Sequence, residues 1–168
     1  MKLALFGISA LMSLVSSSVV AELYVWPWLR DRNREQALTV LIMPHLFLRF
    51  IGLSFLVSGV VSPSLPAAFA RPAAYGDFVA GILAILAVVA LTARASWAVP
   101  TVWLFNIWGA ADLLFALFQG LRLQIDPGAL GATFFIPTAI VPPLLVTHAL
   151  IFAELVRTGA RSTTRRFA

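Results

Sequence analysis

Five long apolar stretches constrain this chain more than any other feature of its sequence. They cover approximately residues 3–26, 39–61, 77–93, 99–119 and 132–156. A helix needs about 20 apolar residues to cross the ~30 Å hydrocarbon layer of a bilayer. Each stretch must be helical there, because irregular backbone and open strand edges leave polar groups unpaired in lipid. The sequence therefore predicts an all-α, polytopic transmembrane bundle with five helices.

The composition excludes the main classes of soluble protein. An ordinary soluble domain is about 45–50% apolar and about 25% charged, whereas hydrophobic residues are 61% of this chain and charged residues 11%. Its 12 basic and 7 acidic residues cannot coat a globule of 168 residues, which excludes a soluble enzyme or a disordered chain. Cysteine is absent, so no disulfide scaffold or thiolate metal site can form.

The connecting segments leave no room for a second domain. Residues 29–37 are charged, residues 62–76 carry three prolines, and residues 120–131 contain the turn signal Asp-Pro-Gly. We expect residues 1–168 to form a single integral membrane domain. In this domain, residues 62–76 are a loop and residues 157–168 are a basic cytoplasmic tail.

The distribution of basic residues predicts the orientation of the bundle. With five spans and a cytoplasmic C-terminus, eight arginines lie on the cytoplasmic side: Arg30, Arg32, Arg34, Arg94, Arg157, Arg161, Arg165 and Arg166. Only Lys2, Arg71 and Arg122 then lie outside, in agreement with the positive-inside rule. Eleven of the 12 basic residues are arginine, which is typical of a GC-rich bacterial genome. We therefore expect a bacterial inner (plasma) membrane protein with its N-terminus outside.

The first apolar stretch has a second interpretation. Lys2, the apolar segment after it and the small residues before Ala21 resemble a secretory signal peptide. Cleavage after Ala21 would leave four helices and would put the arginines of residues 30–34 outside. Because that violates the positive-inside rule, the sequence favours five spans.

Ionisable residues inside a membrane span are costly and indicate candidate functional sites. Arg49 is the only basic residue near the middle of a span, and Asp112 is the only acidic one. Their depths, at a rise of ~1.5 Å per residue, are compatible with pairing. We expect a structural Arg49–Asp112 ion pair. The alternative is a pair that opens during ion or proton transfer.

Four further polar residues are expected in one layer of the bundle: Glu22, His45, Asn106 and His148. A first interpretation is an interhelical hydrogen-bond network, and a second is a ligand or proton-relay site. A third is ligation of a haem b by His45 and His148, since haem iron accepts axial histidine. Zinc held by the two histidines and Glu22 is a further alternative. Two histidines are the entire supply, so no metal or other cofactor is predicted.

The outer loop contributes Arg71 and Asp77. We expect Asp77 to cap the helix that begins there, because aspartate is a favoured N-cap residue. The alternative is a re-entrant lid in which Arg71 meets an anionic ligand. The chain has no nucleophile elbow, P-loop, Rossmann glycine pattern or HExxH sequence, so no enzyme class is indicated.

Four segments, MPHLFLRFIGL, FARPAAYGD, WLFNIWGAADLL and FIPTAIVPP followed by His148, resemble a group of small, uncharacterised bacterial multi-pass membrane proteins. The resemblance covers about residues 44–152 and implies no catalytic or ligand role. The residues that match its pattern are His45, Arg49, Arg71, Asp77, Asn106, Asp112 and His148.

Three functions are compatible with these features. The first is binding or transport of a small molecule or protons at a polar site between the second, fourth and fifth spans. The second is a structural or accessory subunit of a larger membrane complex, and the third is a haem or quinone redox protein. The expected partners are the lipid bilayer and either a second copy or a membrane-complex subunit. Nucleic acid is not expected, because the basic residues lie singly between apolar stretches.

Overall fold

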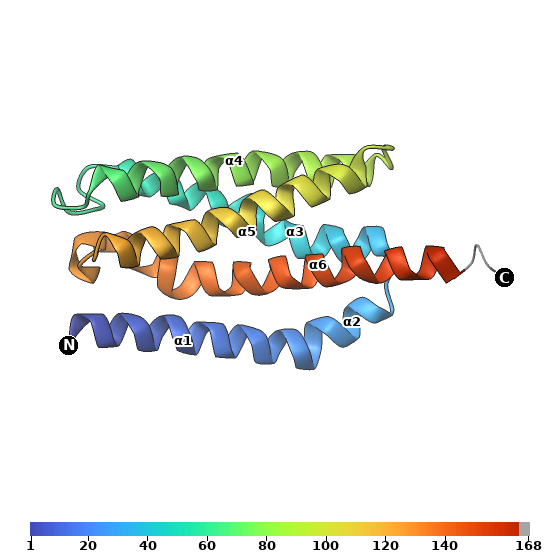
Figure 1. The fold of residues 1–168 in the computed structure, drawn as a ribbon, viewed down its shortest axis with the longest axis horizontal. Helices are drawn as coiled ribbons and strands as arrows, with labels where there is room; N and C mark the ends of the chain where they lie inside the picture. Colours follow the sequence, from blue (N-terminus) through green and yellow to red (C-terminus); the bar gives the residue numbers. More distant parts are fainter. Residues whose placement is uncertain (165–168) are drawn as a thin grey trace.

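The chain folds into an elongated bundle of helices, in which the first helix begins at one end of the bundle and the last helix ends at the other (Figure 1). The structure is a computed structural model that describes residues 1–164. In chain order the elements are α1 (Lys2–Val20), η1 (Ala21–Val25), α2 (Trp26–Arg30), α3 (Arg34–Leu48), η2 (Arg49–Leu56), α4 (Ala67–Thr92), α5 (Ala98–Arg122), η3 (Pro127–Phe134), η4 (Ile136–Ile140) and α6 (Val141–Thr164). No strand occurs among the described residues, so the all-α prediction is confirmed.

Five helical stretches within the described residues are long and apolar enough to cross a membrane. They are Lys2–Arg30, Arg34–Leu56, Ala67–Thr92, Ala98–Arg122 and Ile136–Arg157. The short elements η1 and α2 continue the first stretch, η2 continues the second, and η4 begins the last. The predicted number of five long apolar helices is therefore confirmed.

The segment 62–76 corrects a prediction, because most of it is helical rather than a loop. Helix α4 begins at Ala67 and continues through Pro72. Alanine has the highest helix propensity, and the FARPAAYG segment presents three buried alanines, Ala70, Ala73 and Ala74, to the bundle. Pro72 is exposed and lies near the helix start, where it disturbs few backbone hydrogen bonds. Asp77 consequently lies ten residues inside α4 and is not its N-cap.

The other predicted boundaries shift by smaller amounts. The second span begins at Arg34, where the Asn33 side chain accepts a hydrogen bond from the Gln36 backbone N–H at 2.9 Å. The last span begins at Ile136, so Pro137 lies in its first turn, and Pro142 and Pro143 lie where the π-helical η4 is followed by α6. Helix α6 extends to Thr164, and the end of the predicted tail, residues 165–168, lies outside the described residues.

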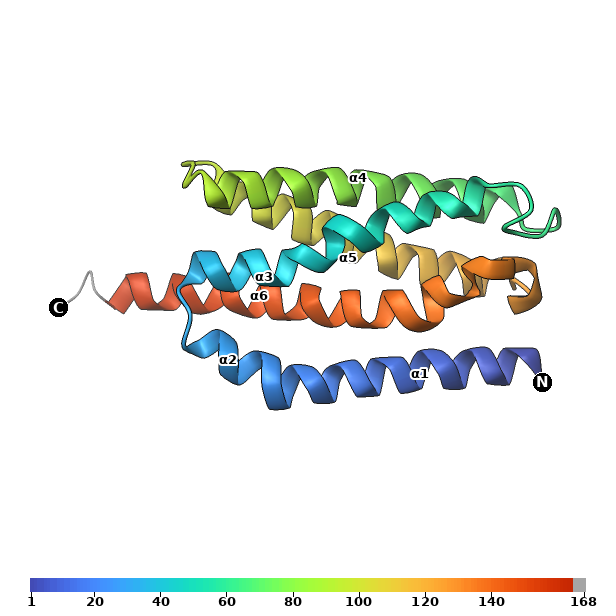
Figure 2. The same cartoon turned by 180° about the vertical axis from the view of Figure 1, so that it is seen from behind.

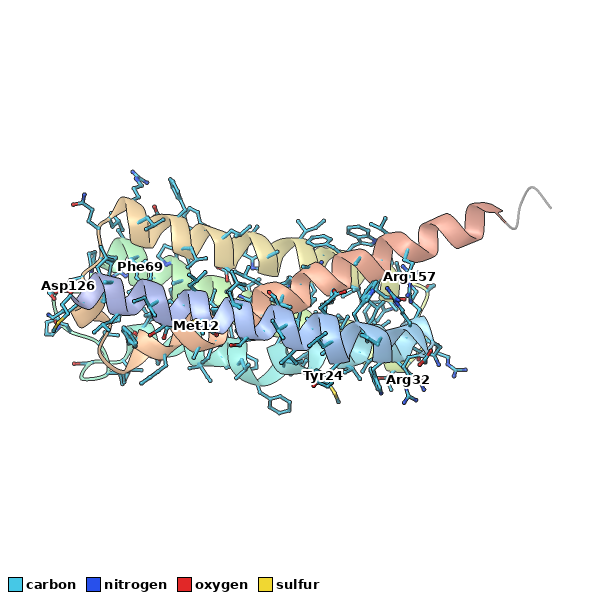
Figure 3. The ribbon with its side chains drawn as sticks, turned by 90° about the horizontal axis from the view of Figure 1, so that it is seen from below. Met12, Tyr24, Arg32, Phe69, Asp126 and Arg157 are labelled. Carbon is cyan, nitrogen blue, oxygen red and sulfur yellow. The ribbon has the colours of Figure 1, made fainter. Side chains whose placement is uncertain are left out.

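Helix α1 forms a separate layer along α6, away from α4 and α5 (Figures 1 and 2). None of its residues is buried, and Met12 and Tyr24 lie on the open side of this layer (Figure 3). The remaining helices enclose two apolar clusters. One cluster includes Leu38 and Phe105, and the other includes Phe69 and Leu130. Five buried polar residues, His45, Arg49, Asp77, Asn106 and His148, lie between the two clusters along their helices.

Candidate functional site

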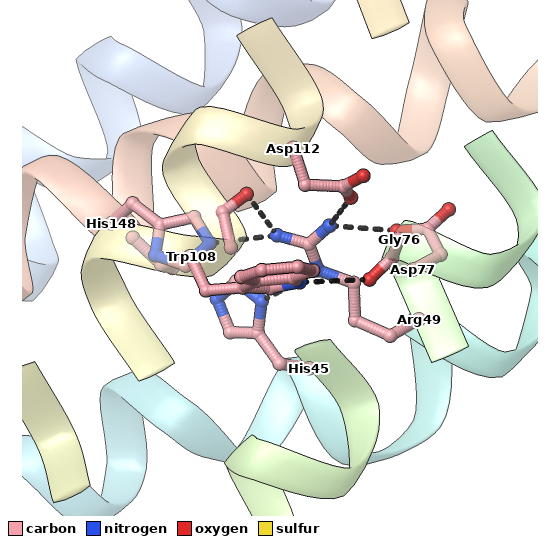
Figure 4. Close-up of polar contacts among 9 residues, drawn as sticks. His45, Arg49, Gly76, Asp77, Trp108, Asp112 and His148 are labelled. Carbon is pink, nitrogen blue, oxygen red and sulfur yellow. Dashed lines mark hydrogen bonds and ion pairs between the residues drawn. The ribbon is translucent and has the colours of Figure 1, made fainter. Parts of the chain in front are cut away.

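Arg49 is the centre of a polar cluster inside the apolar bundle (Figure 4). Its side chain is fully buried at the junction of α3 and η2. Its Nη1 donates to Asp77 Oδ1 at 2.6 Å and to Asp112 Oδ2 at 3.0 Å. Its Nη2 donates to the backbone carbonyl oxygen of Gly109 at 2.7 Å. One guanidinium therefore joins α4 and α5 through two carboxylates and a carbonyl.

The contact between Arg49 and His148 determines the protonation of this imidazole. Arg49 Nη2 lies 2.8 Å from His148 Nε2, and a guanidinium can only donate hydrogen bonds. His148 Nε2 is therefore an acceptor, and the ring proton is on Nδ1, which lies 2.6 Å from Asn106 Oδ1. Asn106 Nδ2 in turn donates to the His148 carbonyl oxygen at 3.2 Å. These contacts require a neutral His148.

His45 is held in the same way from the other side. Its Nδ1 accepts a hydrogen bond from Arg49 Nε at 3.4 Å, so its proton is on Nε2. Nε2 lies 2.9 Å from Thr147 Oγ1, and the Thr147 hydroxyl donates to the Leu144 carbonyl oxygen at 2.8 Å. An imidazolium at either position would direct an N–H at the guanidinium. Both histidines of the cluster are therefore neutral.

The charges of this cluster do not balance. Arg49 supplies one positive charge, Asp77 and Asp112 supply two negative charges when ionised, and the imidazoles supply none. In an apolar interior an uncompensated charge is strongly unfavourable. The cluster therefore has the capacity to hold one additional positive charge, either a proton or a cation.

Three glycines create the space for the cluster. A Cβ atom at Gly52 would overlap the Asp77 side chain, and one at Gly76 would overlap the Asp112 carboxylate. A Cβ atom at Gly109 would lie 2.7 Å from His148 Cε1 and 2.9 Å from Arg49 Nη2. Small residues allow close approach of helices in membranes, and here they allow charged side chains to approach the backbone of a neighbouring helix.

A small cavity lies beside the two carboxylates. Its volume of about 30 Å³ is enough for a water molecule or two. Asp77 and Asp112 form its polar part, and its other walls are apolar residues of α4, α5, η2 and the start of the last span. The carboxylates are thus the part of the cluster that is accessible to a small polar species.

The structure brings together most of the predicted site residues. His45, Arg49, Asn106, Asp112 and His148 all belong to the cluster, and the expected Arg49–Asp112 ion pair is present. Glu22 does not join it, because η1 places its side chain on an exposed face. Arg71 does not join it either, because its side chain is exposed near the start of α4.

Sequence reasoning missed the main partner of Arg49. The N-cap prediction for Asp77 is wrong: the side chain is buried and makes the shorter of the two ion pairs. The Gly76–Asp77 pair in the sequence could have indicated that Asp77 lies inside the bundle. Gly76 lies against the Asp112 carboxylate, so this part of α4 faces the charged cluster. The Trp108 indole N–H also donates to the Gly76 carbonyl oxygen at 3.3 Å, which no sequence pattern indicated.

The geometry does not fit a haem held by His45 and His148. The two ring centroids are 4.4 Å apart, which leaves no space for a porphyrin between them. Their ring nitrogens are all engaged with Arg49, Asn106 and Thr147. The zinc alternative also fails, since Glu22 lies away from the histidines, and no group of three metal-ligating side chains occurs among the described residues.

Comparison with known proteins relates the chain to one family. No curated protein and no solved structure matches it. A family model described as "Domain of unknown function (DUF8737)" matches residues 5–156, which include all five apolar helices to within a few residues of their ends. The whole Arg49 cluster lies in the matched region. The chain therefore belongs to the DUF8737 family.

Proposed function

We propose that this chain is an integral inner-membrane protein that transfers protons through the Arg49 cluster. Five long apolar helices support membrane insertion. The excess of arginines near Arg32 and Arg157 supports a cytoplasmic location for that end, with the N-terminus outside. Arg32 and Arg157 lie at the opposite end of the bundle from Asp126 (Figure 3).

The observation that carries this proposal is the unequal number of charges around Arg49. The guanidinium compensates one carboxylate, and the other requires a proton in the apolar interior. Asp112 is the exchanging acid, because its contact to Arg49, at 3.0 Å, is longer than that of Asp77, at 2.6 Å. Its proton is taken up from the 30 Å³ cavity.

A second cavity lies on the other side of the cluster. It has a volume of about 300 Å³ and lies between α1 with η1 and α6, where Ser16, Ser17 and Thr147 supply its polar atoms. Thr147 is also the partner of the His45 ring. Polar side chains on two sides of Arg49, Asp112 on one and Thr147 on the other, support a pathway in which the guanidinium is an electrostatic gate. Arginine itself keeps its protons, so a proton passes only when Arg49 changes partners.

Proton movement into sealed vesicles tests the proposal. The full chain is reconstituted with an internal pH-sensitive dye, and a potassium diffusion potential is imposed with valinomycin. We expect acidification above that of protein-free vesicles, and its loss in Asp112→Asn. Asp31→Asn, which changes an exposed acid in the segment between α2 and α3, is the matched control and keeps the wild-type rate. Equal rates in protein-free and wild-type vesicles would refute the proposal.

A second candidate function is that of an accessory subunit in a membrane complex. The observation that favours it is the absence of any buried residue in α1. An apolar helix with no buried residue contacts either lipid or another protein in the membrane. Native mass spectrometry of the protein extracted from its own membrane distinguishes the two, because a subunit would appear with a partner of different mass.

A further inference from the structure

A large cavity lies at the end of the bundle that carries the N-terminus. It has a volume of about 640 Å³, within the range of cavities that bind drug-sized ligands. Its walls are mostly apolar and come from α1, α4, α5, η3 and η4. Its polar groups, Gln124 and Asp126, lie at the end of the bundle. The cavity therefore suits a ligand with an apolar body of substantial size.

This cavity adjoins the small cavity beside the carboxylates. The two share four lining residues: Phe69, Ala116, Leu117 and Pro137. Along α5, Asp112, Ala116 and Gly120 follow one another at intervals of four, which places them on one helix face. That face extends ~12 Å from Asp112 to Gly120 at 1.5 Å per residue, and Gln124 follows in the turn after the helix. An elongated molecule can therefore have its body in the large cavity and one end at Asp112.

The chemistry at the inner end selects the polar group of such a molecule. The guanidinium protons of Arg49 are already used, so the groups left for a ligand are carboxylate oxygens, which accept hydrogen bonds. The cluster also lacks one positive charge. A group that both donates hydrogen bonds and carries a positive charge satisfies both requirements. The size of the inner cavity, about 30 Å³, restricts this group to one near the size of water.

We propose that the two adjoining cavities bind an amphiphilic primary amine, with its alkyl body between α1 and α5 and its ammonium at Asp77 and Asp112. A primary ammonium has about the size of a water molecule and three N–H donors. A quaternary ammonium is too large for the inner cavity, and a fatty acid would bring a third negative charge to the carboxylates.

Amine binding couples to the proposed proton transfer, and only this part rests on it. The ammonium replaces the Asp112 proton as the compensating charge, so one proton leaves for water as one ammonium enters. The carboxylate accepts an N–H hydrogen bond in place of its lost O–H, and no covalent bond to carbon changes. The net charge of the cluster is the same before and after the exchange.

Equilibrium dialysis of the full chain in lipid nanodiscs tests the binding. Radiolabelled dodecylamine, dodecanol and dodecanoate share one alkyl chain, and empty nanodiscs correct for partitioning into lipid. We expect dodecylamine to bind at least about tenfold more tightly than dodecanol, since a charged hydrogen bond contributes more than a neutral one. Equal binding of amine and alcohol, or tighter binding of dodecanoate, would overturn the proposal.

Three variants locate the site. Asp112→Asn is expected to reduce dodecylamine affinity about tenfold, to the level of dodecanol. Gly120→Leu places a side chain in the large cavity and weakens both ligands, since a Cβ at this position has only Phe69 within 4 Å, at 3.7 Å. Asp31→Asn leaves both affinities unchanged. Unaltered amine binding in Gly120→Leu would exclude the large cavity.

The amine and proton proposals can fail separately. Selective dodecylamine binding without proton movement in vesicles would refute the proton pathway and support the amine site. Proton movement without selective dodecylamine binding would refute the amine site and support the proton pathway. Because the wild-type comparison of three ligands needs no variant, the amine proposal remains testable even where Asp112→Asn does not fold.

Discussion

At the scale of single residues, Arg49 organises the interior of this protein. It contacts two carboxylates, a carbonyl and two imidazoles, and these contacts use its three guanidinium nitrogens. A buried ion pair is not by itself strong evidence for stability, because desolvation offsets much of the attraction. Removal of one partner is a different matter, since the remaining charges stay buried without compensation.

Replacement of Arg49 is therefore expected to destabilise the fold strongly. In Arg49→Met, Asp77 and Asp112 lose their shared counter-charge, and we expect the free energy of unfolding to fall by about 3–5 kcal/mol. Unfolding in a mild detergent measures the change. Arg71→Met is the control, because Arg71 is exposed, and it should alter the value by less than about 0.5 kcal/mol. A loss of similar size in both variants would contradict the role assigned to Arg49.

At the scale of elements, close approach between α4 and α5 shapes the site. Gly76 faces the Asp112 carboxylate directly, and the Gly76 carbonyl oxygen accepts a hydrogen bond from Trp108. The two helices are also joined by Arg49, which donates to Asp77 of α4 and to Asp112 of α5.

Gly76→Ala tests this close approach. The added methyl group overlaps Asp112, so either the carboxylate or the helix must shift, and we expect a loss of about 1–3 kcal/mol in the free energy of unfolding. Gly7→Ala in α1 is the matched control, because nothing lies within 4 Å of the position that its methyl group would occupy. If Gly76→Ala lowers the free energy of unfolding no more than Gly7→Ala does, α4 and α5 do not approach closely at Gly76.

The elements also show what the sequence could predict. Apolar length identified the five helices, and the scarcity of polar residues within them identified Arg49, Asp112 and both histidines. The start of α4 was missed because proline normally interrupts helices, whereas at Pro72 alanine propensity and the burial of neighbouring alanines prevail. The role of Asp77 was missed for the same reason, because a helix that begins at Asp77 would make this residue a cap rather than a buried partner of Arg49. Glu22 was misplaced because depth alone does not determine the face on which a side chain lies.

At the scale of the whole molecule, the first of the five apolar helices begins at one end of the bundle and the last one ends at the opposite end (Figure 1). This arrangement suits a chain that crosses the membrane five times. The polar cluster then lies between two apolar layers, and the cavity of about 640 Å³ lies at the end that carries the N-terminus. In the proposed orientation this end faces outward, so the amine site is accessible from the outer side.

The orientation has a direct test in reporter fusions. Alkaline phosphatase is active only outside the cytoplasm, and we expect no activity for a fusion after residue 32 and strong activity for one after residue 64. Residue 32 lies between α2 and α3, and residue 64 lies between η2 and α4. Strong activity at residue 32 would place the arginine-rich end outside and reverse the orientation.

The protonation state of Asp112 is the most direct test of the proposed proton transfer. We expect Asp112 to be a protonated carboxylic acid in a cluster that also contains a paired carboxylate and two neutral imidazoles. Infrared difference spectroscopy of the reconstituted protein, recorded in H₂O and D₂O, detects the carbonyl stretch of such an acid. We predict a deuterium-sensitive band of this type that is absent from Asp112→Asn and present in Asp31→Asn. An identical spectrum in wild type and Asp112→Asn would contradict an exchangeable proton at this site.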